Sequence, residues 1–156
     1  MNINLQKATI NDIELLIKLR FDSFIEDGIN LDNEQKNLLT KQMHSYFQKH
    51  ILTNTFIGIL AYVDNKIASV AFLTVSEKPA SPFFITGKTG TLLNVLTYPK
   101  YRRKGIAKLV IEKITQEALH DNVSIIYLNS TDDGKKLYEK LGFTTSKYTG
   151  MRKILL

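Results

Sequence analysis

The chain has 156 residues, no cysteine and a formal net charge of +6. The absence of cysteine excludes disulfide bonds and thiol chemistry and is typical of a cytoplasmic protein. The length suits one domain with a real hydrophobic core, so we expect residues 1–156 to form a single domain. No apolar run approaches the roughly 20 residues of a membrane span, so no membrane contact is expected.

The positive charge is concentrated in one segment. Between Glu77 and Glu112 there is no carboxylate, whereas seven basic residues occur: Lys78, Lys88, Lys100, Arg102, Arg103, Lys104 and Lys108. The rest of the chain contains the other 14 of the 21 Lys and Arg residues and all 15 acidic residues. A nucleic-acid-binding protein would spread its basic residues over a whole face. The distribution therefore favours a compact polyphosphate ligand and argues against nucleic acid as a partner.

The histidines do not predict a metal site. His44 and His50 lie on one expected helix, but a spacing of six residues does not place them on one face as a spacing of four would. His120 lies far away in the sequence. We therefore expect no metal ion.

The first half of the chain predicts a strand, two helices and a hairpin. In chain order we expect a strand at 3–8, a helix from about residue 11, a second helix after residue 32, and strands at 55–63 and 66–73. Thr9 and Asp12 have the spacing of a capping box, and Asp32 is a good N-cap residue. Asp64 and Asn65 tolerate the positive φ angles of a two-residue hairpin turn.

The second half predicts a strand, a helix and a parallel strand. In chain order we expect strands at 92–97 and 123–128 on either side of a helix at 105–120, then a short helix that Gly142 ends, and closing strands at 147–151 and 153–156. Strand, helix and strand at this spacing form a right-handed parallel crossover. The segment 74–90 is harder to assign, because its two prolines disfavour a central strand. Residues 83–85 are an edge-strand candidate.

The turn between the strand at 92–97 and the next helix lacks the usual helix caps. The first turn of a helix leaves four N–H groups unpaired, and Ser, Thr, Asp or Asn usually satisfy some of them. Residues 98–108 contain none of these types, and residues 102–104 add three positive charges to a helix end that is already positive. Gly105 and Ala107 leave room for close approach. The sequence therefore predicts an anion site on this turn.

Two motifs resemble one family. Arg102-Arg103-Lys104-Gly105-Ile106-Ala107 matches the Arg/Gln-x-x-Gly-x-Gly/Ala signature of the GCN5-related N-acetyltransferase (GNAT) superfamily. Residues 137–143, Leu-Tyr-Glu-Lys-Leu-Gly-Phe, resemble the Leu-Tyr-Glu-Lys-x-Gly-Phe segment of the same superfamily at the expected distance. The clear resemblance covers residues 92–143, about a third of the chain. The members that the chain resembles are small, bacterial-type proteins with one domain.

The resemblance implies a fold of the mixed α/β class. That fold is a twisted, mainly antiparallel sheet with one parallel central strand pair and with helices on both faces. It also implies transfer of an acetyl group from acetyl-CoA to a primary amine, and it leaves a homodimer open.

Site residues follow from the same resemblance. The pyrophosphate of acetyl-CoA is expected on the N–H groups of residues 103–107, and its pantetheine arm beside the strand that ends at Thr97. A backbone N–H near Val95 or Leu96 would stabilise the oxyanion, Tyr138 would protonate the departing thiolate, and Asn129 would hold pantetheine or acceptor. The expected acetyl-CoA contacts are Val95, Leu96, Thr97, Arg102, Arg103, Lys104, Gly105, Ile106, Ala107 and Asn129.

Several alternatives stay open. Tyr138 also fits a core position, and Asn129 equally fits a loop residue that ends a strand. Many relatives carry a glutamate on the central strand as general base, yet no acid occurs between Phe83 and Tyr98. A water relay, a backbone carbonyl, Glu26 or Asp27 would then take the proton. The missing acid also motivates a second hypothesis, a non-catalytic acyl-CoA-binding or regulatory module.

Overall fold

The computed structural model describes all residues, 1–156. Its elements are β1 (Ile3–Lys7), α1 (Ile13–Glu26), α2 (Asn33–Leu52), β2 (Phe56–Val63), β3 (Lys66–Glu77), β4 (Lys88–Thr97), α3 (Ile106–His120), β5 (Ile125–Tyr127) and α4 (Asp132–Lys140). Short 3₁₀ turns at Ile10–Asp12 and Pro99–Tyr101 precede α1 and follow β4. No helix is both long enough and apolar enough to cross a membrane.

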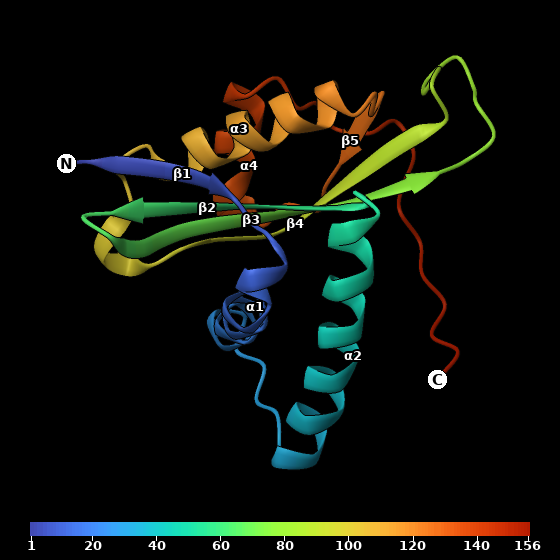
Figure 1. The fold of residues 1–156 in the computed structure, drawn as a ribbon. Coiled ribbons are helices and arrows are strands. Elements are labelled where there is room, and N and C mark those ends of the chain that lie inside the picture. Colours follow the sequence, from blue (N-terminus) through green and yellow to red (C-terminus); the bar gives the residue numbers. More distant parts are fainter.

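The five strands form one sheet in which spatial order follows sequence order, β1-β2-β3-β4-β5. All neighbouring strands are antiparallel except β4 and β5, which run parallel with α3 as the crossover between them. Figure 1 shows the sheet nearly edge-on with helices above and below it. The expected fold class, a mainly antiparallel sheet with one parallel pair and helices on both faces, is therefore confirmed.

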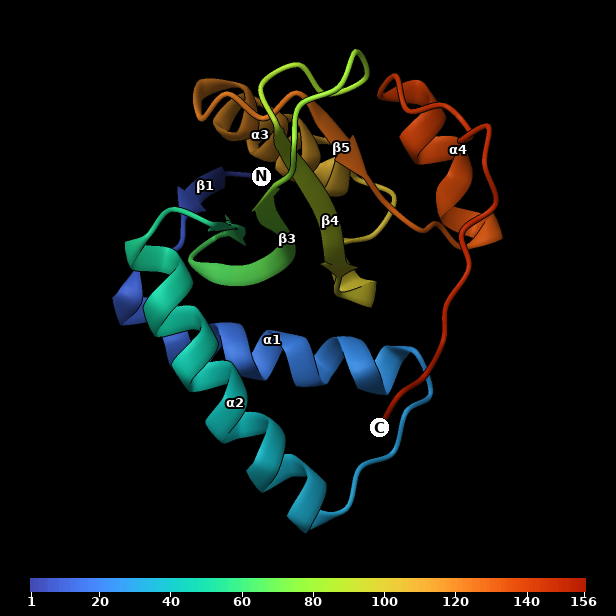
Figure 2. The same ribbon diagram turned by 90° about the vertical axis from the view of Figure 1, so that its right-hand side faces the viewer.

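Each face of the sheet has its own hydrophobic core. The α3 core contains Ile57, Leu73 and Ile111, and side chains of α4 pack against its edge. The α1/α2 core contains Leu16 and Phe72, among others, on the opposite face. Figure 2 shows α1 and α2 below the sheet and α3 behind it. Because full burial of such a side chain stabilises the fold by about 1.5–3 kcal/mol, the two cores fix the sheet between its helices.

Local sequence signals account for the helix starts and the hairpin. The Thr9 side chain accepts a hydrogen bond from the Asn11 amide, and the Asp12 side chain reaches back to the Thr9 amide. Asp32 forms the same kind of reciprocal cap with the third residue of α2. The hairpin turn between β2 and β3 holds two consecutive positive φ angles, as expected.

The segment 74–90 extends the sheet further than the sequence predicts. β3 continues to Glu77 and β4 already begins at Lys88, so the two strands pair along almost their whole length. Both prolines lie in the loop between these ends, where their missing N–H groups break no ladder hydrogen bond. β4 therefore has ten residues.

Three expected strands are wrong. Residues 83–85 form no edge strand, since this loop holds only one isolated bridge, between Ser81 and Phe84. The expected closing strands at 147–151 and 153–156 are also absent. A segment forms a strand only when a sheet edge pairs with it, and residues 147–156 pair with neither edge. It runs past the sheet to the C-terminus instead (Figure 1).

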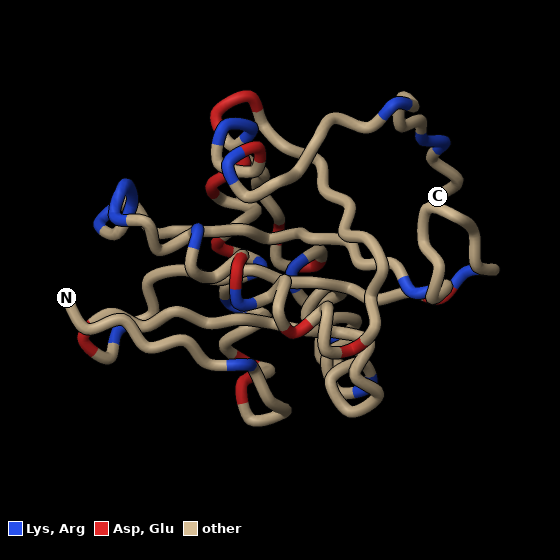
Figure 3. The backbone as a smooth tube through the Cα atoms, turned by 90° about the horizontal axis from the view of Figure 1, so that it is seen from above, with Lys and Arg blue, Asp and Glu red and all other residues tan.

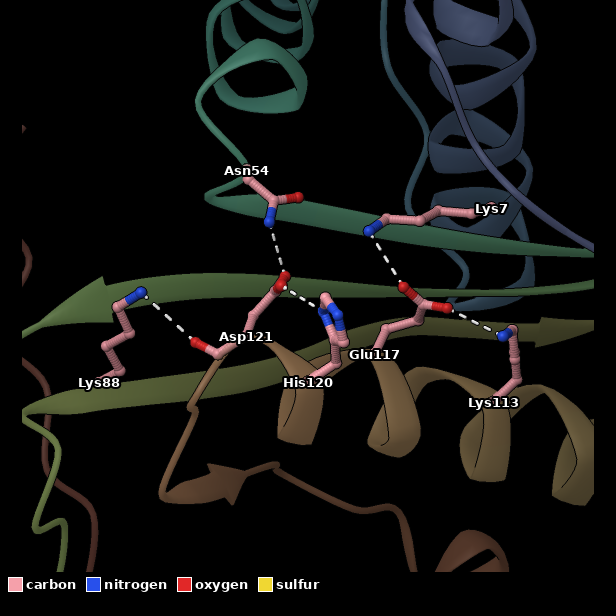
Figure 4. Close-up of polar contacts among 7 residues, drawn as sticks. All are labelled: Lys7, Asn54, Lys88, Lys113, Glu117, His120 and Asp121. Carbon is pink, nitrogen blue, oxygen red and sulfur yellow. Dashed lines mark hydrogen bonds and ion pairs between the residues drawn. The ribbon is translucent and has the colours of Figure 1, made fainter.

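Polar contacts tie the end of α3 to distant parts of the chain. Glu117 accepts from Lys7 of β1 at 3.1 Å and pairs with Lys113 at 2.9 Å. Asp121 accepts from Asn54, which follows α2, at 2.7 Å. Figure 4 shows these contacts side by side along one flank of the sheet. They fix the end of α3 opposite to its basic start.

We expect the Glu117→Gln variant to lose stability at pH 7 but not at pH 3. The two lysine ammonium groups, Lys113 foremost, lower the pKa of Glu117 in the folded state. The contribution of these contacts is therefore present above the ordinary glutamate pKa of about 4.3 and is lost as the pH falls through the lowered value. The partly exposed site limits the loss to about 1 kcal/mol or less.

Urea denaturation of both proteins at the two pH values measures this difference. Glu112→Gln, which removes a longer ion pair to Lys108 at 3.7 Å on the same helix, is the matched control and should change less. An equal loss at pH 3 and pH 7 would show that packing, not charge, makes Glu117 important.

Candidate functional site

The turn that follows β4 is anchored to the protein on one side and open on the other. Tyr101 is buried against the α3 core, and the amide of Tyr98 donates to a β3 carbonyl, so the backbone of the turn is anchored. Arg103 has a φ of 61° and Gly105 a φ of 77°. A left-handed residue other than glycine costs about 1–2 kcal/mol, which marks Arg103 as strained. A Cβ placed on Gly105 would meet no atom within 4 Å, so the turn faces open space.

The backbone N–H groups of residues 103–108 have no hydrogen-bond partner within the chain. Gly105 is the N-cap residue of α3 but provides no side-chain cap, and the first turn contains no acid. The helix start is therefore uncapped, as the sequence predicts. Successive amides in such a turn, at the positive end of a helix dipole, form a concave site for an anion.

The basic side chains beside these amides differ in their contacts. Figure 3 shows Lys and Arg but no Asp or Glu on the loop from β4 to α3. Arg103 is exposed and makes no ion pair. The Lys104 ammonium lies 5.9 Å from the ring centre of Tyr101. Arg102, in contrast, donates to the carbonyl of Thr97 at 2.8 Å and pairs with Glu26 of α1 at 2.6 Å. Arg103 and Lys104 are thus available to an anion, whereas Arg102 is held by α1.

Two expected contacts offer only their backbone. The side chain of Leu96 belongs to the α1/α2 core, and that of Ile106 to the α3 core. Ala107 is half-buried in the first turn of α3. A ligand at this turn would therefore meet main-chain atoms and basic side chains.

A β-bulge interrupts β4. Phe72 pairs with Leu93 but Val70 pairs with Leu96, so two residues of β4 oppose one residue of β3. The first of them, Asn94, has a φ of 53° and is buried. Its amide side chain donates to a carbonyl of α1 and accepts from Arg20 at 3.2 Å. These contacts fix the strand in its bulged form.

β4 and β5 separate after a short pairing. Only Thr89–Thr91 pairs with Ile125–Tyr127, and β5 is about half as long as the expected strand. Figure 2 shows the chain after β5 turning toward α4, whereas β4 continues away from it. The amide of Tyr98 faces β3, so the alternation of a strand turns the backbone groups of Val95 and Thr97 toward the unpaired edge. The second half of β4 therefore presents the main-chain groups of Val95 and the amide of Thr97 on the β5 side, whereas the Thr97 carbonyl already accepts from Arg102.

Tyr138 and Asn129 line one cavity of about 360 Å³. The cavity lies between the end of β5, α4 and the segment that follows α4, and no residue of β4 lines it. Tyr138 is half-buried and its ring packs edge-on against Phe143 at 5.8 Å. Burial raises the pKa of Tyr138, and its hydroxyl makes no hydrogen bond within the chain. Asn129 is exposed at the cavity. The tyrosine hydroxyl is therefore protonated at neutral pH and free to donate.

Sequence reasoning missed Lys18 and Asp22 of α1, which contact the residue after β4, and named Glu26 only as a proton-acceptor candidate. Asp22 accepts hydrogen bonds from Tyr98 and, at 2.5 Å, from Lys18. Burial, followed by the bond to Asp22, raises the pKa of Tyr98. Glu26, one turn further along, pairs with Arg102. The only sequence signal was the four-residue spacing of these charges, which places them on one side of the helix. No group of three or more His, Asp or Glu side chains could hold a metal ion.

These features are a sheet whose parallel strands separate and, beside it, a helix start that can bind an anion. Residues 22–143 match the model of the acetyltransferase (GNAT) family. The chain therefore belongs to the acetyltransferase (GNAT) family, and it is an acyltransferase of the N-acetyltransferase type. No curated protein matches the chain.

Solved structures with the same architecture include several acetyltransferases. A predicted acetyltransferase from Clostridium acetobutylicum, solved with acetyl-CoA, is 27% identical with a TM-score of 0.83, and the match covers 97% of this chain and 96% of that one. A GCN5-related N-acetyltransferase from Ralstonia eutropha JMP134 is 20% identical with a TM-score of 0.81, covering 97% and 99%. An aminoglycoside acetyltransferase from an uncultured soil sample is 17% identical with a TM-score of 0.74, covering 99% and 96%. The last two show likeness of fold alone.

Proposed function

We propose that residues 1–156 form a single cytoplasmic domain that transfers an acetyl group from acetyl-CoA to a primary amine. The observation that carries this proposal is the row of unpartnered N–H groups at residues 103–108, beside two unpaired basic side chains. A diphosphate has the charge and the acceptor oxygens that such a turn requires. The Clostridium relative solved with acetyl-CoA supports the same donor.

The chain would hold acetyl-CoA at two places. The amides of residues 103–107 and the side chains of Arg103 and Lys104 would bind the pyrophosphate. Val95, through both of its backbone groups, and Thr97, through its amide, would pair with the pantetheine arm, in the manner of an added strand. The unpaired edge of β4 supports this assignment, because free main-chain groups at a sheet edge need partners.

Chemically, the amine nitrogen would attack the acetyl carbonyl carbon, forming a C–N bond as the C–S bond breaks. The amide of Val95, which faces the open edge, would stabilise the developing oxyanion. Tyr138 would give its proton to the leaving sulfur, and Asn129, in the same cavity, would hold pantetheine or acceptor. The raised pKa of Tyr138 supports an acid role, because the hydroxyl keeps its proton until the pH exceeds about 10.

The proton of the attacking amine would leave through water. β4 has no carboxylate, and Glu26 is paired with Arg102. Asp22 already accepts two hydrogen bonds. We therefore expect the rate to increase with pH up to the pKa of the amine, about 10 for an alkylamine.

A thiol-release assay tests the function. The protein is incubated with acetyl-CoA and a panel of polyamines, amino acids, aminoglycosides and peptides, and each acetylated product is checked by mass spectrometry. We expect amine-dependent release of CoA with at least one class. Acetyl-CoA binding without turnover across the panel would favour the non-catalytic module, and absence of binding would contradict the proposal.

A further inference from the structure

Arg20 is a half-buried cation without an ion-pair partner. Its guanidinium donates to the side chain of Asn94 at 3.2 Å and lies 4.7 Å from the ring centre of Phe24. No carboxylate lies within 4 Å of it. Burial lowers the pKa of Arg20, and the charge of Asp27 opposes this effect only in part. A buried cation is normally paired, because removal from water is costly.

Other cations that link α1 to the end of β4 are neutralised. Lys18 of α1 pairs with Asp22, and Arg102 in the turn pairs with Glu26. Arg20 has five N–H donors, and only one of them has an acceptor in the protein. The ring of Phe24 supports the flat face of the guanidinium and leaves its edge, where the donors lie, for another acceptor. The remaining guanidinium donors are not buried unsatisfied atoms, so they are accessible to an acceptor from outside the chain.

The position of Arg20 relates it to the reacting groups. Asn94 opens the β-bulge, and the next residue, Val95, turns its backbone toward the unpaired edge of β4. The proposed function places the acetyl carbonyl at this amide. Arg20 contacts Asn94, which directly precedes Val95, on the face of the sheet that α1 covers. Only the side chain of Asn94 therefore connects Arg20 to the strand at the proposed site of attack. An anion bound there would belong to the molecule that approaches the acetyl group.

We propose that Arg20 binds an oxyanion group of the acceptor, so that the substrate is an amine that also carries a carboxylate or a phosphate. This inference rests on the proposed function and names its substrate class. Carboxylate and phosphate share the two-oxygen face that a guanidinium binds through parallel N–H bonds. The basic segment around β4, which has no acid, adds to the attraction for an anionic acceptor.

Matched pairs of amines test the proposal. Alanine is compared with alaninamide, phosphoethanolamine with ethanolamine, and glucosamine 6-phosphate with glucosamine, each in the thiol-release assay. Because a hydrogen bond between charged groups is stronger than one between neutral groups, we expect kcat/KM to favour the anionic member of at least one pair about tenfold or more. Preference within the alanine pair would identify a carboxylate, and preference within the other pairs a phosphate.

The Arg20→Gln variant separates recognition from structure. We expect it to raise KM for the anionic member about tenfold and to abolish the preference, with kcat changed less than KM, and Arg20→Lys to restore part of the loss. An equal loss for both members of a pair would mean that Arg20 only supports Asn94, and would overturn the proposal. So would a wild-type enzyme that does not prefer the anionic amines.

A binding measurement keeps this test independent of turnover. The same amines are titrated by calorimetry into the protein saturated with CoA, for the native chain and for Arg20→Gln. If no amine is acetylated, the proposed function fails, yet tighter binding of the anionic member that Arg20→Gln abolishes would still support the anion site. Equal binding of both members would overturn the anion site alone.

Discussion

The double variant Arg103→Glu, Lys104→Glu should weaken acetyl-CoA binding about 100-fold or more. Each charged hydrogen bond to phosphate contributes about 1.5–3 kcal/mol, and every 1.4 kcal/mol is a tenfold change in Kd. The reversal removes two attractive charges and adds two repulsive ones at a helix start that already lacks a cap. Titration calorimetry with acetyl-CoA measures the change, and the affinity of the native protein should fall as salt is added.

A second charge reversal separates a local effect from net charge. Lys36 and Lys41 are exposed on α2 and make no ion pair, so Lys36→Glu, Lys41→Glu changes the net charge by the same amount far from the turn. We expect this control to bind acetyl-CoA within about twofold of the native protein. Unchanged binding in the Arg103, Lys104 variant would contradict the phosphate assignment and remove the main support for the proposed function.

Tyr138→Phe should lower kcat about 100-fold while acetyl-CoA binding stays the same. General acid catalysis contributes about 10²–10⁴-fold, and phenylalanine keeps the ring but has no proton to give. Because the hydroxyl makes no hydrogen bond within the chain, its loss should change the free energy of unfolding by less than about 0.5 kcal/mol. Steady-state kinetics, with calorimetry and thermal unfolding on the same samples, measure all three quantities.

The pH profile and a matched tyrosine distinguish catalysis from packing. Burial raises the pKa of Tyr138, so the native enzyme should keep its acid form and lose activity only above about pH 10. Tyr127→Phe, in the same cavity, is the matched control and should retain activity. Full turnover by Tyr138→Phe would show that the residue is a packing tyrosine and that another donor protonates the sulfur.

Local signals were sufficient to predict most of the fold. The capping boxes at Thr9 and Asp32, the hairpin at Asp64 and the crossover through α3 all depend on residues close together in sequence. The strands predicted at 147–156 failed for the opposite reason. Strand formation needs a partner edge, and pairing between distant segments cannot be predicted from the residues of one segment.

The candidate site, too, could be predicted only in part from the sequence. The uncapped helix start could be predicted, because it depends on which residue types are missing from one short segment. The bulge at Asn94 and its contact with Arg20 could not, since they join positions 74 residues apart. Asn94 lies in the stretch between Phe83 and Tyr98 that contains no acid. The structure shows a different use of that position, a buried amide that fixes the bend of the strand.

The bulge also changes which residues of β4 face each side of the sheet. Leu93 and Leu96 are three residues apart, yet both face the helices α1 and α2. An unbroken strand forbids this, because its side chains alternate strictly. The extra residue lets the first half of β4 pair on both sides while the second half leaves its β5 side unpaired, and both leucines stay on the α1/α2 face. Deletion of a single residue here would move the side chains that follow it to the opposite face of the sheet. The length of β4 is therefore constrained by the two cores that its side chains enter.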